Sequence, residues 1–130
     1  MSTAYAHVLV AHGSTSLRWR APFEVLAQTL AACDPSRIVA LCYLEKCTPT
    51  VSTVLDDLYR QGCRTLRVSP LFLSSGRHLD HDLPHLLTAW LDYHTDARLE
   101  VDPALGEQAA ILSALAHALC AQPTAVYRPS

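Results

Sequence analysis

A chain of 130 residues is long enough for one ordinary domain and short for two. Half of its residues are hydrophobic and 17% are charged, which allows a buried core and excludes the composition of a disordered protein. The formal net charge of -2 excludes binding of nucleic acid or of an anionic membrane through an overall positive charge. No apolar run approaches the ~20 residues of a membrane-spanning helix, and the first residues lack a signal-peptide pattern. We therefore expect a cytoplasmic protein.

Short apolar runs alternate with helical stripes along the chain. Runs typical of buried strands cover residues 6–11, 38–44, 66–73 and 99–101. After each run, apolar residues spaced by three and four predict a helix: over 23–31, 51–59, 86–91 and 106–121. This alternation predicts an α/β fold, a three-layer α/β/α arrangement with a four-stranded parallel sheet. We expect one domain over residues 1–121 and a flexible tail over 122–130.

Local signals predict where some of these elements begin and end. Thr48 followed by Pro49 is typical of a helix start, and Gly62 of a helix end. Asp82 and Pro84 predict that the third helix begins after His81 and before the next apolar stripe. The five cysteines are odd in number and lack C-x-x-C spacing, which predicts reduced, mostly buried thiols rather than disulfides or a zinc site.

Chemically active side chains follow three of the predicted strands. His12 comes after the first strand, Glu45 after the second and His78 after the third. Ligands of such folds bind beyond the carboxyl ends of the strands, so we expect these three side chains to meet at one edge. Two imidazoles and a carboxylate suit Co(II), Fe(II), Ni(II) or Zn(II) better than Mg(II) or Ca(II). The sequence therefore predicts a site for a divalent transition-metal ion.

Other residues in these loops leave two interpretations open. Gly13 and Gly76 permit a positive φ or a close backbone approach beside a ligand. Ser14 could bind an anion or cap the following helix, and His81 and His85 could add metal ligands or be exposed residues at a helix start. Four cationic residues could meet a polyanionic ligand or be solvated: Arg18, Arg20, Lys46 and Arg77. The remaining histidines are expected to be structural or solvent-facing: His7, His94 and His117.

Three segments of the chain resemble the small CbiX/SirB-type chelatases, which insert cobalt, iron or nickel into sirohydrochlorin. They are residues 8–14 (Val-Leu-Val-Ala-His-Gly-Ser), 43–45 (Tyr-Leu-Glu) with Pro49, and 70–78 (Pro-Leu-Phe-Leu-Ser-Ser-Gly-Arg-His) continuing to 82–84. The resemblance extends over residues 6–106, and its third segment is the most specific. It implies a chelatase-like, flavodoxin-related lobe.

The resemblance also implies an activity and a set of site residues. The implied reaction is insertion of a divalent metal, cobalt as first choice, into sirohydrochlorin on the route to cobalamin or sirohaem. His12 and His78 match the metal-binding and catalytic histidines of the family, and Glu45 falls where the family has an acidic residue that faces the same cavity. Our candidate substrate-binding residues are Gly13, Ser14, Arg18, Ser75, Gly76 and Arg77. Thr15 stands where many relatives have arginine, and Arg18 is our candidate replacement.

Larger relatives have two similar lobes with the cleft between them. A chain of this length supplies one lobe, so the resemblance implies a homodimer with the cleft between subunits. The metal ion is then a substrate. No nucleotide cofactor is expected, because the chain contains neither G-x-G-x-x-G nor a phosphate-binding P-loop pattern.

Metal insertion exchanges two pyrrole protons for one ion, so it needs a base and a loosely held metal near the macrocycle. An imidazole can do both, since it titrates near ~6.5. The main alternative is a non-catalytic protein of the same fold that binds metal or tetrapyrrole. A phosphotransfer enzyme is disfavoured because Ala11, not arginine, precedes His12, and a serine hydrolase at Ser14 is disfavoured because G-x-S-x-G is absent.

Overall fold

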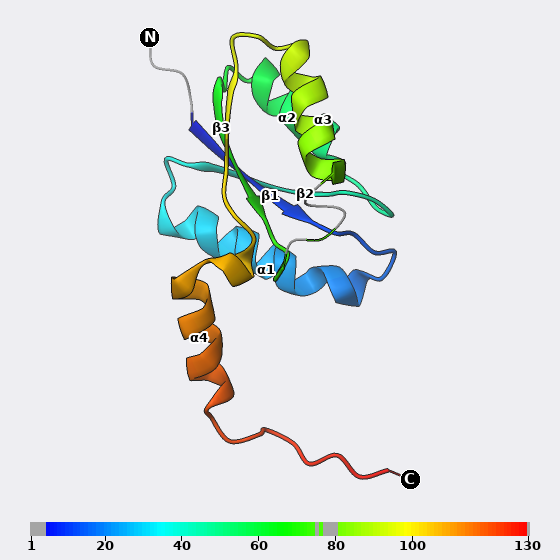
Figure 1. Cartoon of the computed structure of the whole chain (residues 1–130), viewed down its shortest axis with the longest axis vertical. Coiled ribbons are helices and arrows are strands. Elements are labelled where there is room, and N and C mark those ends of the chain that lie inside the picture. The colour runs from blue at the N-terminus through cyan, green and yellow to red at the C-terminus, as the bar shows by residue number, and fades with distance from the viewer. Residues whose placement is uncertain (1–4, 75, 77–80, 130) are drawn as a thin grey trace.

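The computed structural model describes residues 5–74, 76 and 81–129. Its elements in chain order are β1 (Tyr5–Ala11), α1 (Leu17–Cys33), β2 (Ile38–Tyr43), α2 (Val51–Arg60), β3 (Thr65–Pro70), α3 (Leu83–Asp92), β4 (Arg98–Val101), the 3-10 turn η2 (Leu105–Glu107) and α4 (Ala109–Leu119). The four strands form one parallel sheet in the order β2-β1-β3-β4 (Figure 1). The predicted α/β fold with a four-stranded parallel sheet is confirmed.

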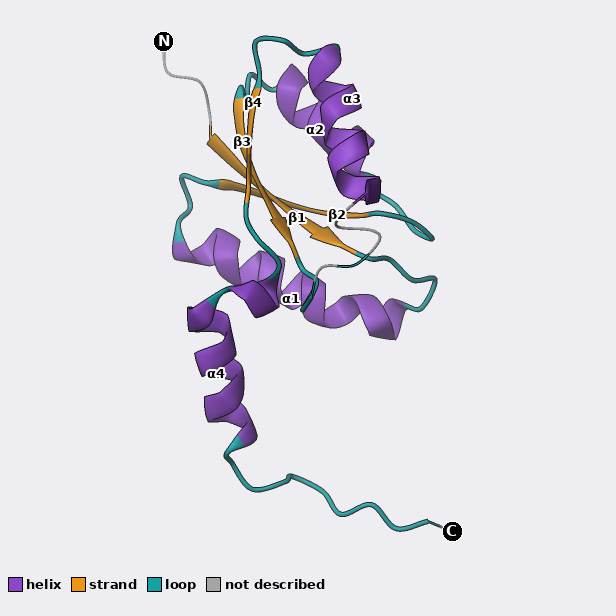
Figure 2. Ribbon diagram, in the orientation of Figure 1, coloured by secondary structure: helices purple, strands orange, loops and turns teal. Residues whose placement is uncertain are grey.

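Helices lie on both faces of the sheet but cover them unequally. Figure 2 shows α2 and α3 together on one face, α1 crossing the other, and α4 pointing away from the body. The main core lies between the sheet and α2 and α3, because alternate strand residues point to that face. Its buried members are Ala6, Val8, Val10, Cys42, Val51, Val54, Leu55, Leu58, Cys63, Leu66, Val68, Leu83, Leu87 and Trp90.

The ends of the helices follow from local hydrogen bonds. Thr50, rather than the predicted Thr48, caps α2, since its side-chain oxygen accepts from the backbone N of Thr53 at 3.3 Å. At the other end Gly62 has a φ of +98°, and its N donates to the carbonyl of Tyr59, so the predicted cap at Gly62 is confirmed. The last helix begins at 109 rather than 106, because residues 105–107 form the tighter turn η2.

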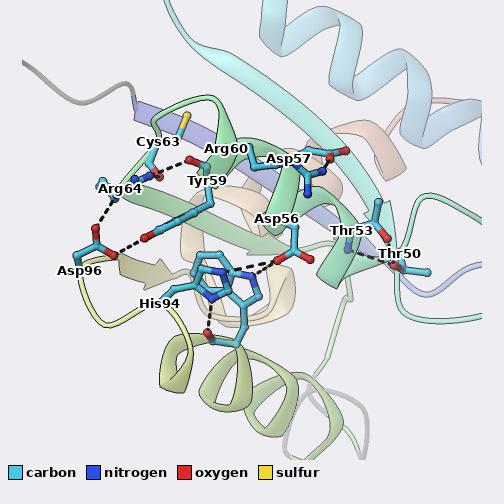
Figure 3. Close-up of polar contacts among 11 residues, drawn as sticks. Thr50, Thr53, Asp56, Asp57, Tyr59, Arg60, Cys63, Arg64, His94 and Asp96 are labelled. Atoms are coloured by element: carbon cyan, nitrogen blue, oxygen red, sulfur yellow. Dashed lines mark hydrogen bonds and ion pairs between the residues drawn. The ribbon is translucent and has the colours of Figure 1, made fainter.

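A cluster of rings and carboxylates joins the C-terminal ends of α2 and α3 (Figure 3). The indole Nε1 of Trp90 donates to Oδ1 of Asp56 at 2.8 Å, and the ring of His94 stacks on the indole with 3.9 Å between centroids. The hydroxyl of Tyr59, whose ring meets both others edge-on, donates to Asp96 at 2.7 Å. His94 is therefore structural, as predicted.

A second polar cluster lies on the α1 side of the sheet, around the buried His7. The Nε2 of His7 donates to Oγ of Ser69 at 2.6 Å, and that hydroxyl donates to Oδ2 of Asp102 at 2.5 Å. The Nε of Arg67 donates to the same carboxylate oxygen at 2.9 Å. Burial lowers the pKa of His7, and the charges of Arg67 and Arg37 lower it further. Burial favours a higher pKa for Asp102, but hydrogen bonds from Ser69 and Arg67 outweigh it and lower the pKa.

All five cysteines are free thiols. Cys42 and Cys63 are buried, and burial raises the pKa of Cys42 to about 12. Cys33 and Cys120 are exposed at the ends of α1 and α4, so the prediction of mostly buried thiols is wrong for these two. The difference arises because the helix layer on the α1 side buries none of its own residues.

Candidate functional site

The loops after β1 and β2 bring His12 and Glu45 into contact. The two strands are neighbours and parallel, with Ala11 opposite Tyr43, so their carboxyl ends meet at the same edge of the sheet. The Nε2 of His12 lies 2.9 Å from Oε1 of Glu45. Both side chains are reachable from solvent, with 39% and 43% of their surface exposed. The structure thus places together two of the three predicted metal ligands.

Backbone contacts fix the distance between these two loops. The N of Leu44 donates to the carbonyl of Ala11 at 3.0 Å, and the N of Glu45 to the carbonyl of His12 at 3.1 Å. Gly13 has a φ of +114°, and a Cβ added there would lie 1.8 Å from the carbonyl oxygen of Glu45. Both the positive φ and the lack of space for a Cβ therefore require glycine at position 13. The predicted positive φ and close backbone approach at Gly13 are confirmed.

The start of the loop after β3 lies beside the same pair. The N of Leu71 donates to the carbonyl of Val10 at 2.8 Å, which continues the sheet pattern past the end of β3. The ring of Phe72 then meets the imidazole of His12 edge-on, with 6.0 Å between centroids. This contact gives the imidazole an apolar neighbour that the sequence analysis did not predict, although Phe72 belongs to the most specific of the three segments.

Further along this loop the structure tests few of the predictions. Ser75, Arg77 and His78 lie outside the described residues, so their roles stay predictions. Gly76 is exposed, has a φ outside the left-handed region, and has no described neighbour within 4 Å of an added Cβ. Among the described residues nothing therefore requires glycine at this position, and its contact with substrate stays a prediction.

The loop after β4 supports the loop after β3. The N of Leu105 donates to the carbonyl of Phe72 at 2.8 Å, and the N of Gly106 donates to the carbonyl of Leu73 at 2.5 Å. A Cβ at Gly106 would lie 2.1 Å from the carbonyl oxygen of Leu73. No motif in the sequence predicts this support, although glycine is rare, with four residues in the whole chain.

The first turn of α1 lies directly after the loop of His12. Oγ of Ser14 accepts from the backbone N of Ser16 at 3.1 Å, and Oγ of Ser16 accepts from the N of Trp19 at 3.3 Å. The cap of α1 is therefore Ser16, and Ser14 shapes the turn before it. Arg18 is exposed in this first turn. His81 and His85 are exposed around the start of α3.

The geometry of His12 and Glu45 allows two kinds of chemistry. Two ligand atoms that bind one metal ion at ~2.1 Å, with roughly a right angle between the bonds, lie about 3 Å apart. The Nε2 of His12 and Oε1 of Glu45 are 2.9 Å apart, so their spacing is compatible with a shared metal ion. Without metal, the carboxylate of Glu45 can only accept a hydrogen bond, so the neutral imidazole of His12 carries its proton on Nε2. Nδ1 then keeps its lone pair and is the basic nitrogen of the ring. Among the described residues no third His, Cys, Asp or Glu joins the pair.

Comparison with known proteins places this chain in a family. The family model named CbiX matches residues 6–122. The sirohydrochlorin cobaltochelatase of Methanococcoides burtonii is 29% identical over 103 residues, covering 78% of this chain and 77% of the relative. That of Methanocaldococcus jannaschii is 32% identical over 89 residues, covering 68% of this chain and 62% of the relative.

Solved structures share the fold. The CbiX protein from Marinobacter aquaeolei VT8 superposes with a TM-score of 0.78 at 28% identity, over 89% of this chain and 94% of the other. The sirohydrochlorin chelatase SirB from Bacillus subtilis subspecies spizizenii, in complex with cobalt, has a TM-score of 0.78 at 22% identity, over 89% of this chain and 50% of its own. This chain thus spans about half the length of SirB. Because the CbiX model matches nearly all of the described sequence, the protein belongs to the CbiX family.

Proposed function

We propose that this protein is a sirohydrochlorin chelatase, which inserts a divalent metal ion into sirohydrochlorin in the synthesis of cobalamin- or sirohaem-type tetrapyrroles. The observation that carries the proposal is the His12–Glu45 pair at the carboxyl edge of a CbiX-family sheet. The relatives named sirohydrochlorin cobaltochelatase support the same substrate and favour cobalt among the metals. Iron and nickel remain chemically suitable for the same ligand atoms.

In this proposal the metal ion is a substrate that the protein holds loosely and passes on. His12 and His78 act as metal ligand and proton acceptor, and Glu45 orients His12 or completes the metal site. Each pyrrole N–H must lose a proton as its nitrogen takes up the metal. A carboxylate 2.9 Å from the imidazole stabilises the imidazolium that forms when His12 takes one of these protons.

The substrate carries many carboxylates, which need donors around the reacting centre. Backbone N–H groups beside Gly13 and Ser14, at the start of α1, are suited to bind them, as is the guanidinium of Arg18. Ser75, Gly76 and Arg77, which follow β3 in the sequence, are the other proposed donors. The chemistry needs no nucleotide cofactor.

The chain is proposed to act as a homodimer in the cytoplasm. A chain that spans half of SirB supplies half of a two-lobed cleft, and a second copy supplies the other half. In the described part of the chain, no helix is both long and apolar enough to cross a bilayer. Five free thiols are typical of a reducing compartment.

The test is an anaerobic insertion assay with sirohydrochlorin and Co(II), Fe(II) or Ni(II) in parallel, followed by absorbance. His12→Ala should lower the rate about 10²–10⁴-fold, the range of general acid–base catalysis, and Glu45→Gln about 10–100-fold. Matched exposed changes away from the edge, His117→Ala and Glu100→Gln, should keep the wild-type rate. A His12→Ala variant as active as wild type would overturn the assignment.

The same assay separates the chelatase from the non-catalytic binder. A wild-type protein that binds Co(II) and sirohydrochlorin but gives no absorbance change above the spontaneous rate would establish the binder. Equilibrium binding of Co(II) alone, measured by calorimetry, completes the comparison, because His12→Ala should weaken it in both cases.

A further inference from the structure

Arg20, in the first turn of α1, has a buried donor without an acceptor. Its Nε is shielded from solvent, and no group in the described part of the chain accepts a hydrogen bond from it. Leaving a buried donor unpaired costs about as much free energy as a lost hydrogen bond, so such groups are rare in folded proteins. Of the two interpretations left open for Arg20, a solvated cation therefore does not fit this nitrogen, whereas an acceptor supplied by a ligand does.

Arg20 lines a hollow of about 340 Å³ between α1 and β2. The hollow lies on the α1 side of the sheet, along the border formed by the edge strand β2. Leu41 and Pro49 give it an apolar wall. Tyr43 and Thr48 add hydroxyl-bearing side chains to the lining. A largely apolar cavity of this volume with a few polar groups is typical of a site for a small organic molecule.

The hollow borders the candidate site but is built from other residues. Tyr43 is the last residue of β2 and lies opposite Ala11, which directly precedes His12. The hollow therefore adjoins the carboxyl edge of the sheet, on the face that α1 covers. Neither His12 nor Glu45 lines it, so it can take up a group of its own.

The charges around the hollow favour an anion with a single charge. Burial raises the pKa of Tyr43, the negative charges of Cys47 and Glu24 raise it further, and the positive charge of Arg20 opposes them. The phenol therefore stays protonated and able to donate near neutral pH. Because Glu24 also lines the hollow and is exposed, it would repel a phosphate dianion more strongly than a carboxylate.

We propose that this hollow binds a carboxylate, with the guanidinium of Arg20 donating from Nε and one terminal nitrogen to its two oxygens. The planar fork of a guanidinium matches two such oxygens, and the hydroxyls of Tyr43 and Thr48 are further donors. The apolar wall is suited to receive the carbon chain of the ligand. The carboxylate has two sources: a free small organic acid, or a side chain of the bound tetrapyrrole, and the second source rests on the proposed function.

Nuclear magnetic resonance of the Arg20 Nε–H group tests binding directly, with propionate as the probe. Propionate at constant ionic strength should shift this signal, and the neutral isostere propionamide should not. Arg20→Gln should weaken propionate binding about 10–100-fold, because the charged hydrogen bonds are lost. Glu24→Gln should tighten it, because a repelling carboxylate is removed. Arg60→Gln, at an exposed position on α2, is the matched control and should leave it unchanged.

The stability of Arg20→Met tests whether the donor is unpaired in the free protein. Methionine suits a helix about as well as arginine and has no N–H group, so the urea midpoint without propionate should not fall. Propionate should then raise the midpoint of wild type and leave that of Arg20→Met unchanged. A lower midpoint for Arg20→Met without propionate would show that the guanidinium has a partner within the chain, and would overturn the proposal.

The insertion assay distinguishes the two sources of the carboxylate. If the tetrapyrrole supplies it, Arg20→Gln should raise the KM for sirohydrochlorin at least ~10-fold with kcat unchanged. An unchanged KM together with lost propionate binding would assign the hollow to a free acid. The binding measurements use neither metal nor tetrapyrrole, so a protein that inserts no metal contradicts the chelatase and leaves the hollow testable. A propionate-insensitive Nε–H signal together with an unchanged KM would mean that Nε meets water only, and would refute the inference.

Discussion

Replacing Gly13 with alanine should destabilise the protein more than the same change at Gly62, although both glycines have a positive φ. Gly62 has a φ of +98° and no described atom within 4 Å of an added Cβ, so Gly62→Ala tests the backbone conformation by itself. At Gly13, with a φ of +114°, the added Cβ would lie 1.8 Å from the carbonyl oxygen of Glu45. The pair of variants therefore separates conformational strain from steric overlap.

The expected difference can be worked out from these contacts. A non-glycine residue at positive φ costs about 1–2 kcal/mol, partly offset by the lower entropy of the unfolded chain, so Gly62→Ala should lose about 1 kcal/mol. Real Cβ atoms essentially never come within 3.0 Å of such a neighbour, so in Gly13→Ala the loop of Glu45 must move. That movement breaks the backbone hydrogen bond from the N of Glu45 to the carbonyl of His12, which costs about 1 kcal/mol, and it strains the adjoining turn. We expect Gly13→Ala to lose about 3 kcal/mol in all.

Urea denaturation of the two variants measures the difference in the free energy of unfolding, and the insertion assay measures its effect on the site. Gly13→Ala should also reduce insertion, because moving Glu45 changes its distance from His12, whereas Gly62→Ala should keep the wild-type rate in the folded state. Equal losses of stability in the two variants would show that the overlap with Glu45 does not matter, and would refute this reasoning.

Three other features give separate predictions. Trp90→Phe removes the hydrogen bond to Asp56 and should cost about 1–2 kcal/mol of unfolding free energy in urea, so an unchanged midpoint would contradict the role of this contact. The pKa of His7 is lowered in the folded protein, so below about pH 6.5 the unfolded chain takes up a proton that the native chain does not. The free energy of unfolding should therefore decrease as the pH decreases. His7→Gln should flatten this fall between about pH 6.5 and 5, and an equally steep curve would point to other groups. Alkylation followed by mass spectrometry should modify Cys33 rapidly and leave Cys42, with its pKa of about 12, unmodified until the protein unfolds.

The elements of the fold could be predicted because their apolar residues follow two clear periods. The stripe predicted over 51–59 is an example, since Val51, Val54, Leu55 and Leu58, which are spaced by three and four, are all buried in α2. The exact start of α2 could not be predicted in the same way, because Thr48 and Thr50 are both able to cap a helix. The choice depends on which side chain meets the N of Thr53, a matter of three-dimensional geometry.

The His12–Glu45 contact could be predicted because neighbouring parallel strands end at one edge of the sheet. The support from Gly106 to Leu73 could not, since it joins two loops whose paths are set by their backbones. Likewise Leu112, Leu115 and Leu119 of α4 follow a helical spacing, but a spacing does not show whether a stripe is buried. In the described structure these three residues are exposed and are not part of the core.

Backbone hydrogen bonds link the loops at the carboxyl edge in the order of the strands. Glu45 is tied to His12, Val10 to Leu71, and Phe72 to Leu105. The spacing of the predicted ligands is therefore set mainly by main-chain contacts, which do not depend on the identity of most loop side chains. It follows that exposed loop side chains can change while His12 and Glu45 stay in contact. The exceptions are positions where a Cβ would enter these contacts, which is why Gly13 and Gly106 are the sensitive sites of this edge.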